Sequence, residues 1–191
     1  MKRIFVFIYD DMADFEITFI THLLGADLAM EVVTISYEDK LIRSKSGVTY
    51  KPSKLIKNVL EEDADGLIIP GGWNGEIRPE LIELIQNINS KGNLLGAICA
   101  GPRFLAKAGV LDNVRYTTSI VDWTETHKKD FMEEDPFPRQ NFILDRVIRD
   151  GNIITAQGTA FIDFAVEIVD WFGGFDDEED KNAFTKVIKG I

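Results

Sequence analysis

Two patterns of apolar and polar positions alternate along this chain. Short, almost wholly apolar runs are typical of interior strands in a parallel sheet. Longer stretches, in which apolar residues recur every three or four positions, are typical of amphipathic helices. The runs that predict strands are Arg3–Tyr9, Glu31–Tyr37, Gly66–Pro70, Asn93–Ile98, Arg115–Thr118, and the pair Arg146–Arg149 and Asn152–Ala156, which we expect to form a hairpin across Asp150-Gly151.

The predicted helices lie between these strands. They are Asp14–Ala29 with Phe15 facing the core, Ser53–Glu61 capped by Ser53, Pro79–Ser90, Arg103–Gly109, Thr159–Phe172 and the tail Asp176–Lys189. A hairpin is expected within Lys40–Pro52, and Asp122–Gln140 is polar and poorly periodic. Strands and helices in alternation predict an α/β three-layer sandwich, in which helices cover both faces of a mainly parallel sheet. We expect residues 1–191 to form one domain.

The net charge of the chain argues against two classes of binding partner. The formal net charge of −11 opposes binding to nucleic acid or to an anionic membrane surface. The apolar run near the N-terminus is too short for a signal peptide and continues into Asp10-Asp11, and no segment is apolar enough to span a bilayer. A single cysteine excludes an internal disulfide, so we expect a reducing cytoplasmic location.

That cysteine, Cys99, lies where the predicted strand Asn93–Ile98 changes into a helix. In parallel α/β sheets, functional sites form beyond the carboxyl ends of the strands. We therefore expect Cys99 to meet the segments Asp10–Glu16 and Gly71–Gly75 there. The free N–H groups of the helix that follows are expected to favour a thiolate and lower the thiol pKa. The alternative is a small buried apolar residue, the usual role of a free cysteine.

Three nearby aspartates, Asp10, Asp11 and Asp14, raise the question of a metal site. No histidine or further carboxylate has a supporting spacing, and capping of the following helix accounts for them. We therefore expect no metal and no cofactor.

Four motifs in order resemble the ThiJ/PfpI family, which includes parkinsonism-associated deglycase. They are Ala13-Asp14-Phe15-Glu16, Ile68-Ile69-Pro70-Gly71-Gly72, Ala97-Ile98-Cys99-Ala100-Gly101-Pro102 and Gly158-Thr159-Ala160. The resemblance extends from Arg3 to about Phe172. It implies the class I glutamine amidotransferase-like fold with a flavodoxin-like central sheet, and it suggests a homodimer.

The resemblance also implies roles for single residues. Cys99 matches the nucleophilic or redox-sensing cysteine, and Glu16 matches the acid that hydrogen-bonds its sulfur. A carboxyl that donates to a thiolate must be protonated, so the pKa of Glu16 is expected to be raised. Gly72 and Ala100 match the residues whose backbone N–H groups could form an oxyanion hole.

One position departs from the peptidase-like members of that family. They carry histidine directly after the cysteine, where this chain has Ala100, so a classical peptidase is not expected. His22 is expected to be structural, whereas His127 is either a candidate partner for Cys99 or a solvated surface residue. Trp73, Thr118 and Trp123 are candidate pocket residues, with plain packing as the alternative for the two tryptophans.

These observations favour an enzyme that acts on a small electrophilic substrate through a Cys99 thiolate assisted by Glu16. Glyoxalase- or deglycase-like, hydratase-like and amidase-like reactions all remain open. The alternative is a redox-responsive stress protein in which Cys99 is oxidised to a sulfinate without steady turnover. A third possibility is a binding protein that keeps the fold and has lost the chemistry.

Overall fold

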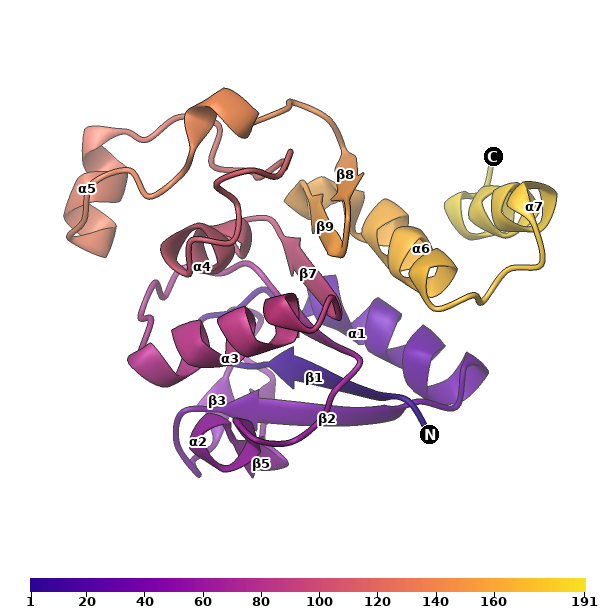
Figure 1. Cartoon of the computed structure of the whole chain (residues 1–191), viewed down its shortest axis with the longest axis horizontal. Coiled ribbons are helices and arrows are strands. Elements are labelled where there is room, and N and C mark those ends of the chain that lie inside the picture. The colour runs from indigo at the N-terminus through magenta and orange to yellow at the C-terminus, as the bar shows by residue number, and fades with distance from the viewer.

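The computed structural model describes residues 1–191 and contains a central seven-stranded sheet (Figure 1). The strand order is β5-β2-β1-β6-β7-β9-β8. All neighbours are parallel except β8 and β9, which pair antiparallel across Asp150-Gly151. The strands are β1 (Arg3–Phe7), β2 (Glu31–Ser36), β5 (Lys54–Leu55), β6 (Gly66–Ile69), β7 (Leu94–Ile98), β8 (Val147–Asp150) and β9 (Ile153–Ala156).

Helices cover both faces of this sheet. On one face α1 packs against α6, and α6 lies on β7 and β9, with α7 on its outer side. On the other face α3 lies on β6 and β7, with α2 and α4 beside it. The helices are α1 (Phe15–His22), α2 (Ile56–Val59), α3 (Pro79–Ser90), α4 (Pro102–Lys107), α5 (Glu125–Phe131), α6 (Phe161–Trp171) and α7 (Glu178–Lys189). The predicted mainly parallel sheet between helical layers is confirmed.

The central strands explain why the sheet is buried on both sides. Every residue of β6, β7 and β9 is buried, which is what an apolar strand under two helical layers requires. Apolar side chains from both helical layers belong to a single buried cluster with the sheet. None of the helices combines the length and the apolar character needed to cross a membrane.

Two predictions of local secondary structure are wrong. Ser53–Glu61 is not one helix: β5 first pairs with β2, and Ser53 bonds to Thr34 instead of capping α2. Arg115–Thr118 is not a strand and contributes only the single bridge between Tyr116 and Phe142. Both errors have one cause, since neighbouring strands offered these segments backbone and side-chain partners that periodicity does not reveal.

The first helix is also shorter than predicted. The α-helical part ends at His22, and a π-helical turn, η1 (Leu23–Asp27), follows. Phe15 is 51% exposed, against the expectation that it faces the core, and rests edge-on against Phe161. Glu16 takes the inward position instead and is only 2% exposed. A polar residue thus occupies a place on the core face of α1.

Two shorter elements complete the chain. The predicted hairpin within Lys40–Pro52 is present as β3 (Ile42–Arg43) and β4 (Thr49–Tyr50). The polar stretch Asp122–Gln140 contains α5, whose N-cap Thr124 forms a capping box with His127. Two short turns of 3-10 helix, η2 (Arg139–Asn141) and η3 (Gly158–Ala160), flank the hairpin of β8 and β9.

Candidate active site

Cys99 occupies a sharp turn directly after β7. Its φ angle is +61°, in the left-handed region that a residue with a Cβ rarely adopts. Hydrogen bonds hold this backbone in place: the Cys99 N–H donates to the Ala156 carbonyl, and the Cys99 carbonyl accepts from Ser119 N–H and the Thr118 hydroxyl. The turn leaves the side chain partly exposed beyond the carboxyl ends of the strands.

Glycines surround this turn because there is no room for side chains. A Cβ added to Gly71 would lie 2.9 Å from the Cys99 sulfur, and one added to Gly158 would lie 3.0 Å from it. A Cβ on Gly101 would lie 2.6 Å from the Ile69 carbonyl oxygen. Gly71 and Gly158 let the backbone after β6 and β9 approach the sulfur closely, and Gly101 lets the turn after β7 pack against the end of β6. The close-approach residue of the Pro70-Gly71-Gly72 motif is therefore Gly71.

Glu16 reaches the same point from α1. The Gly71 N–H donates to Glu16 Oε2 at 2.6 Å, and the carboxyl group is within hydrogen-bonding reach of the Cys99 sulfur. The Ala13 N–H donates in turn to the Gly71 carbonyl at 2.9 Å. Two bonds therefore connect the start of α1 to the loop after β6, which brings Cys99, Glu16 and Gly71 into one cluster.

Burial changes the acidity of both ionisable groups. It raises the pKa of Glu16 to about 7, against the lowering effect of the Gly71 N–H. It also raises the pKa of the Cys99 thiol to about 12, and the negative charge of Glu16 adds to that rise. The raised pKa of Glu16 agrees with expectation, whereas the predicted lowering of the thiol pKa is wrong. The first turn of α4 begins at Pro102, which has no N–H, so the predicted helical donors are fewer.

The two groups therefore titrate as a pair. Ionising both would place two negative charges in contact in a buried site, so above the pKa of Glu16 the pair keeps one proton. With Glu16 ionised the proton stays on the sulfur. When the proton moves to Glu16, the largest charge opposing a thiolate is removed.

Ser119 is a neighbour of the sulfur that the sequence offered only as one of three hydroxyl residues, Thr117, Thr118 and Ser119, that could face a ligand. Its hydroxyl lowers the pKa of Cys99 by hydrogen bonding to the sulfur, and it also accepts from the Gly158 N–H at 2.9 Å. Thr118, the residue named as a pocket candidate, directs its hydroxyl to the Cys99 carbonyl instead, at 2.6 Å. The only signal for Ser119 in the sequence was its place in a run of hydroxyl residues after Tyr116.

Two backbone donors, one after β6 and one after β7, have no oxygen partner within the protein. Neither the Gly72 N–H nor the Ala100 N–H donates to another backbone or side-chain oxygen. The Ala100 N–H acts on the sulfur and lowers the pKa of the thiol. Fixed donors of this kind can stabilise an oxygen on which negative charge develops.

The remaining pocket candidates lie elsewhere. Trp73 is 63% exposed, with the Lys45 ammonium 5.2 Å from its ring centre. Trp123 packs against Phe131, and its indole N–H donates to the Glu133 carbonyl. His127 takes part in the capping of α5, its Nδ1 accepting from the Thr124 N–H at 3.1 Å. No histidine is among the groups that act on the acidity of Cys99.

The aspartates after β1 do not cap α1 as predicted. Asp14 makes no capping bond and accepts from the hydroxyls of Ser46 and Tyr50 at 2.7 and 2.9 Å. Asp10 pairs with Lys40 and accepts from the Arg43 N–H. No group of three or more histidine, cysteine or acidic side chains is arranged to hold a metal ion.

Comparisons with known proteins agree with this geometry. YdeA, named an uncharacterised protease, from Bacillus subtilis is 28% identical over 177 residues, 90% of this chain and 85% of the relative. The glutathione-independent glyoxalase DJR-1.2 from Caenorhabditis elegans is 29% identical over 150 residues, 76% of this chain and 75% of the relative. A DJ-1 superfamily structure from Agrobacterium tumefaciens superposes with a TM-score of 0.82 at 25% identity, covering 100% of this chain and 98% of that one.

The family model described as DJ-1/PfpI family matches residues 2–171. That span includes every element of the sheet together with α1 and α6, and it contains Cys99, Glu16 and the glycines around them. The resemblance inferred from the four sequence motifs is confirmed, and the chain belongs to the DJ-1/PfpI family.

Proposed function

We propose that this protein is a cysteine-dependent enzyme that acts on a small electrophilic carbonyl compound. The observation that carries the proposal is the contact between the Cys99 thiol and the buried Glu16 carboxyl, with the Ala100 N–H acting on the sulfur and the Gly72 N–H free of an oxygen partner in the loop after β6. A nucleophile, a proton acceptor and oxyanion donors are the parts that addition to a carbonyl requires. The naming of one relative as a glyoxalase supports an aldehyde as substrate.

In this mechanism the sulfur attacks the carbonyl carbon while its proton passes to the Glu16 carboxylate. A carbon–sulfur bond forms and the carbon–oxygen π bond breaks, which places a negative charge on the oxygen. The Gly72 and Ala100 N–H groups stabilise that charge. Glu16 then returns the proton to the oxygen, which gives a hemithioacetal. A pKa of about 7 suits Glu16 to both accepting and donating a proton near neutral pH.

The test is a screen of methylglyoxal and other aldehydes, isonitriles and small amides against the wild type, Cys99→Ala and Glu16→Gln. We expect turnover of an aldehyde by the wild type and a loss of at least about a hundredfold in kcat/KM in each variant. Thr126→Ala, which changes an exposed residue of α5, serves as the matched control and should keep full activity. Undiminished turnover by the Cys99→Ala protein would refute the mechanism.

A second candidate function rests on the donors around the sulfur. The Ser119 hydroxyl and the Ala100 N–H both act on it, and such donors would also stabilise the oxygens of a sulfinate. In this role peroxide oxidises Cys99 and is reduced to water, with no turnover of an organic substrate. Mass spectrometry after mild peroxide treatment should then show two oxygens added at Cys99. A thiol that remains unmodified counts against sensing.

A further inference from the structure

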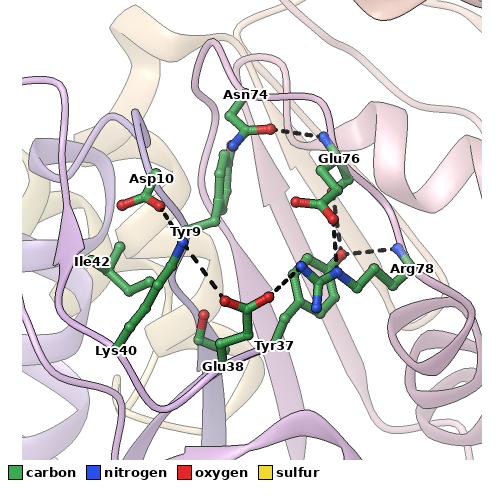
Figure 2. A pocket seen from close by; sticks show the side chains of 10 residues that line it. Tyr9, Asp10, Tyr37, Glu38, Lys40, Ile42, Asn74, Glu76 and Arg78 are labelled. Atoms are coloured by element: carbon green, nitrogen blue, oxygen red, sulfur yellow. Dashed lines mark hydrogen bonds and ion pairs between the residues drawn. The ribbon is translucent and has the colours of Figure 1, made fainter.

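A hollow separate from Cys99 opens at the carboxyl ends of β1 and β2. Its enclosed part is about 30 Å³ and opens into a wider space of about 320 Å³ that includes solvent. Figure 2 shows the labelled side chains from the segments after β1 and β2, from β3 and from the loop after β6 arranged around an open centre. Tyr9 connects it to the neighbouring site, since its ring lines the hollow and its hydroxyl donates to the Pro70 carbonyl directly before Gly71.

The rim of this hollow is a chain of ion pairs with alternating sign. Asp10 pairs with Lys40 at 2.9 Å, and Lys40 lies 3.9 Å from Glu38. Glu38 pairs with Arg78 at 2.7 Å, and Arg78 pairs with Glu76 at 2.7 Å. The chain therefore begins and ends with a carboxylate, as can be followed in Figure 2. Three acids and two bases leave one negative charge in excess.

This excess favours a cation as the occupant. Only one carboxylate oxygen of Glu76, Oε1, has a partner, so Oε2 is available to a ligand. The overall charge of −11 acts in the same direction, because it raises the local concentration of cations near the surface. An ammonium group placed between the two terminal carboxylates would complete the alternation of charges.

A buried hydroxyl provides an independent indication of a ligand. Ser36 is 2% exposed and lines the hollow, yet its hydroxyl makes no hydrogen bond within the protein. The Ser36 oxygen is not among the atoms fully shielded from solvent, so it faces the hollow and is open to a ligand that supplies the missing partner. The ring of Tyr37 forms part of the apolar wall beside it, held by the Arg78 guanidinium 4.7 Å from its centre.

We propose that this hollow binds a small primary amine that carries one uncharged polar group. The ammonium group lies between the terminal carboxylates of Asp10 and Glu76, and the polar group bonds to the Ser36 hydroxyl. Short aliphatic amino alcohols have this chemistry. The site is distinct from the Cys99 site, and its existence does not depend on the proposed enzymatic function.

The experiment is an NMR titration of the backbone amides with ethanolamine, using ethylene glycol and glycolate as neutral and anionic probes of matched size. Ethanolamine should cause saturable shifts in the amides of Ser36, Glu38 and Glu76, weaker at high salt, and the other two probes should not. Shifts of equal size with ethylene glycol, or no saturable shifts with ethanolamine, would overturn the proposal.

Three variants make the test specific. Glu76→Gln keeps an acceptor for Arg78 but removes a charge, and should weaken binding about tenfold, equivalent to about 1.4 kcal/mol. Ser36→Ala should weaken it about fivefold without loss of folding, because that hydroxyl has no partner in the protein. Glu61→Gln changes an exposed carboxylate that does not line the hollow and should have no effect.

The same titration separates this proposal from the enzymatic one. Cys99→Ala should bind ethanolamine as the wild type does, since Cys99 does not line the hollow. Retained affinity in both the Glu76→Gln and Ser36→Ala proteins would contradict the assignment, whatever the activity of Cys99.

Discussion

At the scale of single residues, Cys99 combines a reactive group with an unfavourable backbone conformation. Its left-handed φ of +61° places Cβ against the backbone, at a cost of about 1–2 kcal/mol for a residue other than glycine. The bonds to Ala156, Thr118 and Ser119 maintain that conformation. The backbone conformation at this position therefore favours glycine, whereas the reaction requires the thiol of cysteine.

We predict that Cys99→Gly is more stable than Cys99→Ala by about 1 kcal/mol, because glycine adopts positive φ without a steric penalty. Denaturant unfolding of the two inactive variants measures the difference. Ala97→Gly within β7 is the control: its backbone is part of a buried strand, so the substitution should destabilise the protein. Equal stability of the two Cys99 variants would show that the turn is not strained.

Glu16 should make stability depend on pH in an unusual direction. Its pKa is raised from 4.5 to about 7, so the native state keeps a proton that the unfolded chain loses in this window. The contribution of Glu16 to the free energy of unfolding is therefore largest below about pH 4.5. It falls as the pH rises to about 7, by roughly 3 kcal/mol in total. Glu16→Gln, whose amide can accept from Gly71 and donate to the sulfur, should remove that loss.

Unfolding measured at about pH 5 and about pH 8 tests this linkage. The variant should gain stability over the wild type at the higher pH and much less at the lower one. Asp163→Asn gives the opposite trend as a comparison, because ion pairs with Lys189 and Arg146 lower the pKa of that carboxyl. If Glu16→Gln and the wild type show the same change in the free energy of unfolding between the two pH values, ionisation of Glu16 does not destabilise the native state.

The family motifs in the sequence selected Cys99 and Glu16, which the fold brings together, but they could not predict the acidity of either group. The thiol pKa depends on burial and on the charge of Glu16, which are properties of the folded site. The inward turn of Glu16 and the outward turn of Phe15 likewise depend on the Gly71 N–H, a donor fifty-five positions away in the sequence. Hydrophobicity alone predicts that Phe15 is buried and Glu16 is exposed.

At the scale of elements, Arg103 of α4 fastens the segment that contains α5. The Arg103 side chain is almost wholly buried, pairs with Glu133 and donates to the Gly75 carbonyl. Its guanidinium lies 4.3 Å from the ring centre of Phe131 at the end of α5. One cation therefore connects α4, the loop after β6 and the segment that contains α5.

Arg103→Leu should destabilise the protein by about 3 kcal/mol, since the buried partners of the guanidinium would remain without compensation. Hydrogen exchange should show the largest loss of protection in α5, and little change in β1 and β6. Arg115→Leu, which removes an exposed ion pair with Asp150, should cost less than about 1 kcal/mol. Unchanged protection of α5 would contradict the role of Arg103 as its anchor.

Helices and strands were predictable where the apolar periodicity agrees with the residues that typically begin or end such elements. Pro79–Ser90 has a proline at its first turn and an apolar stripe, and α3 has the predicted bounds. Ser53–Glu61 and Arg115–Thr118 failed because pairing with distant strands decided their structure. In Asp122–Gln140, a helix of seven residues with no buried side chain leaves no apolar stripe to detect.

At the scale of the whole molecule, α7 lies outside the span that matches the family and adds a layer over α6. Lys181 pairs with Glu167 and Asp170 of α6, and Phe184 packs against Phe175. These contacts lie on the far side of α6 from the sheet. The layer therefore contributes to stability without shaping the surroundings of Cys99.

Removal of residues 175–191 should lower the free energy of unfolding by about 2 kcal/mol, through loss of apolar contacts on α6. The alkylation rate of Cys99 by iodoacetamide should stay unchanged, which makes the rate an internal control for folding. A truncated protein with an altered alkylation rate would show that α7 acts on the site.

The short bond from the Gly71 N–H to Glu16 has a spectroscopic consequence. The Gly71 nitrogen lies 2.6 Å from a carboxylate oxygen of Glu16, so the amide proton between them is deshielded. The deshielding weakens when that carboxylate takes up a proton. The chemical shift of a single glycine thus follows the charge on its neighbour in the resting protein, without any label. Proton sharing between oxygen and sulfur becomes observable from a position that takes no part in the reaction.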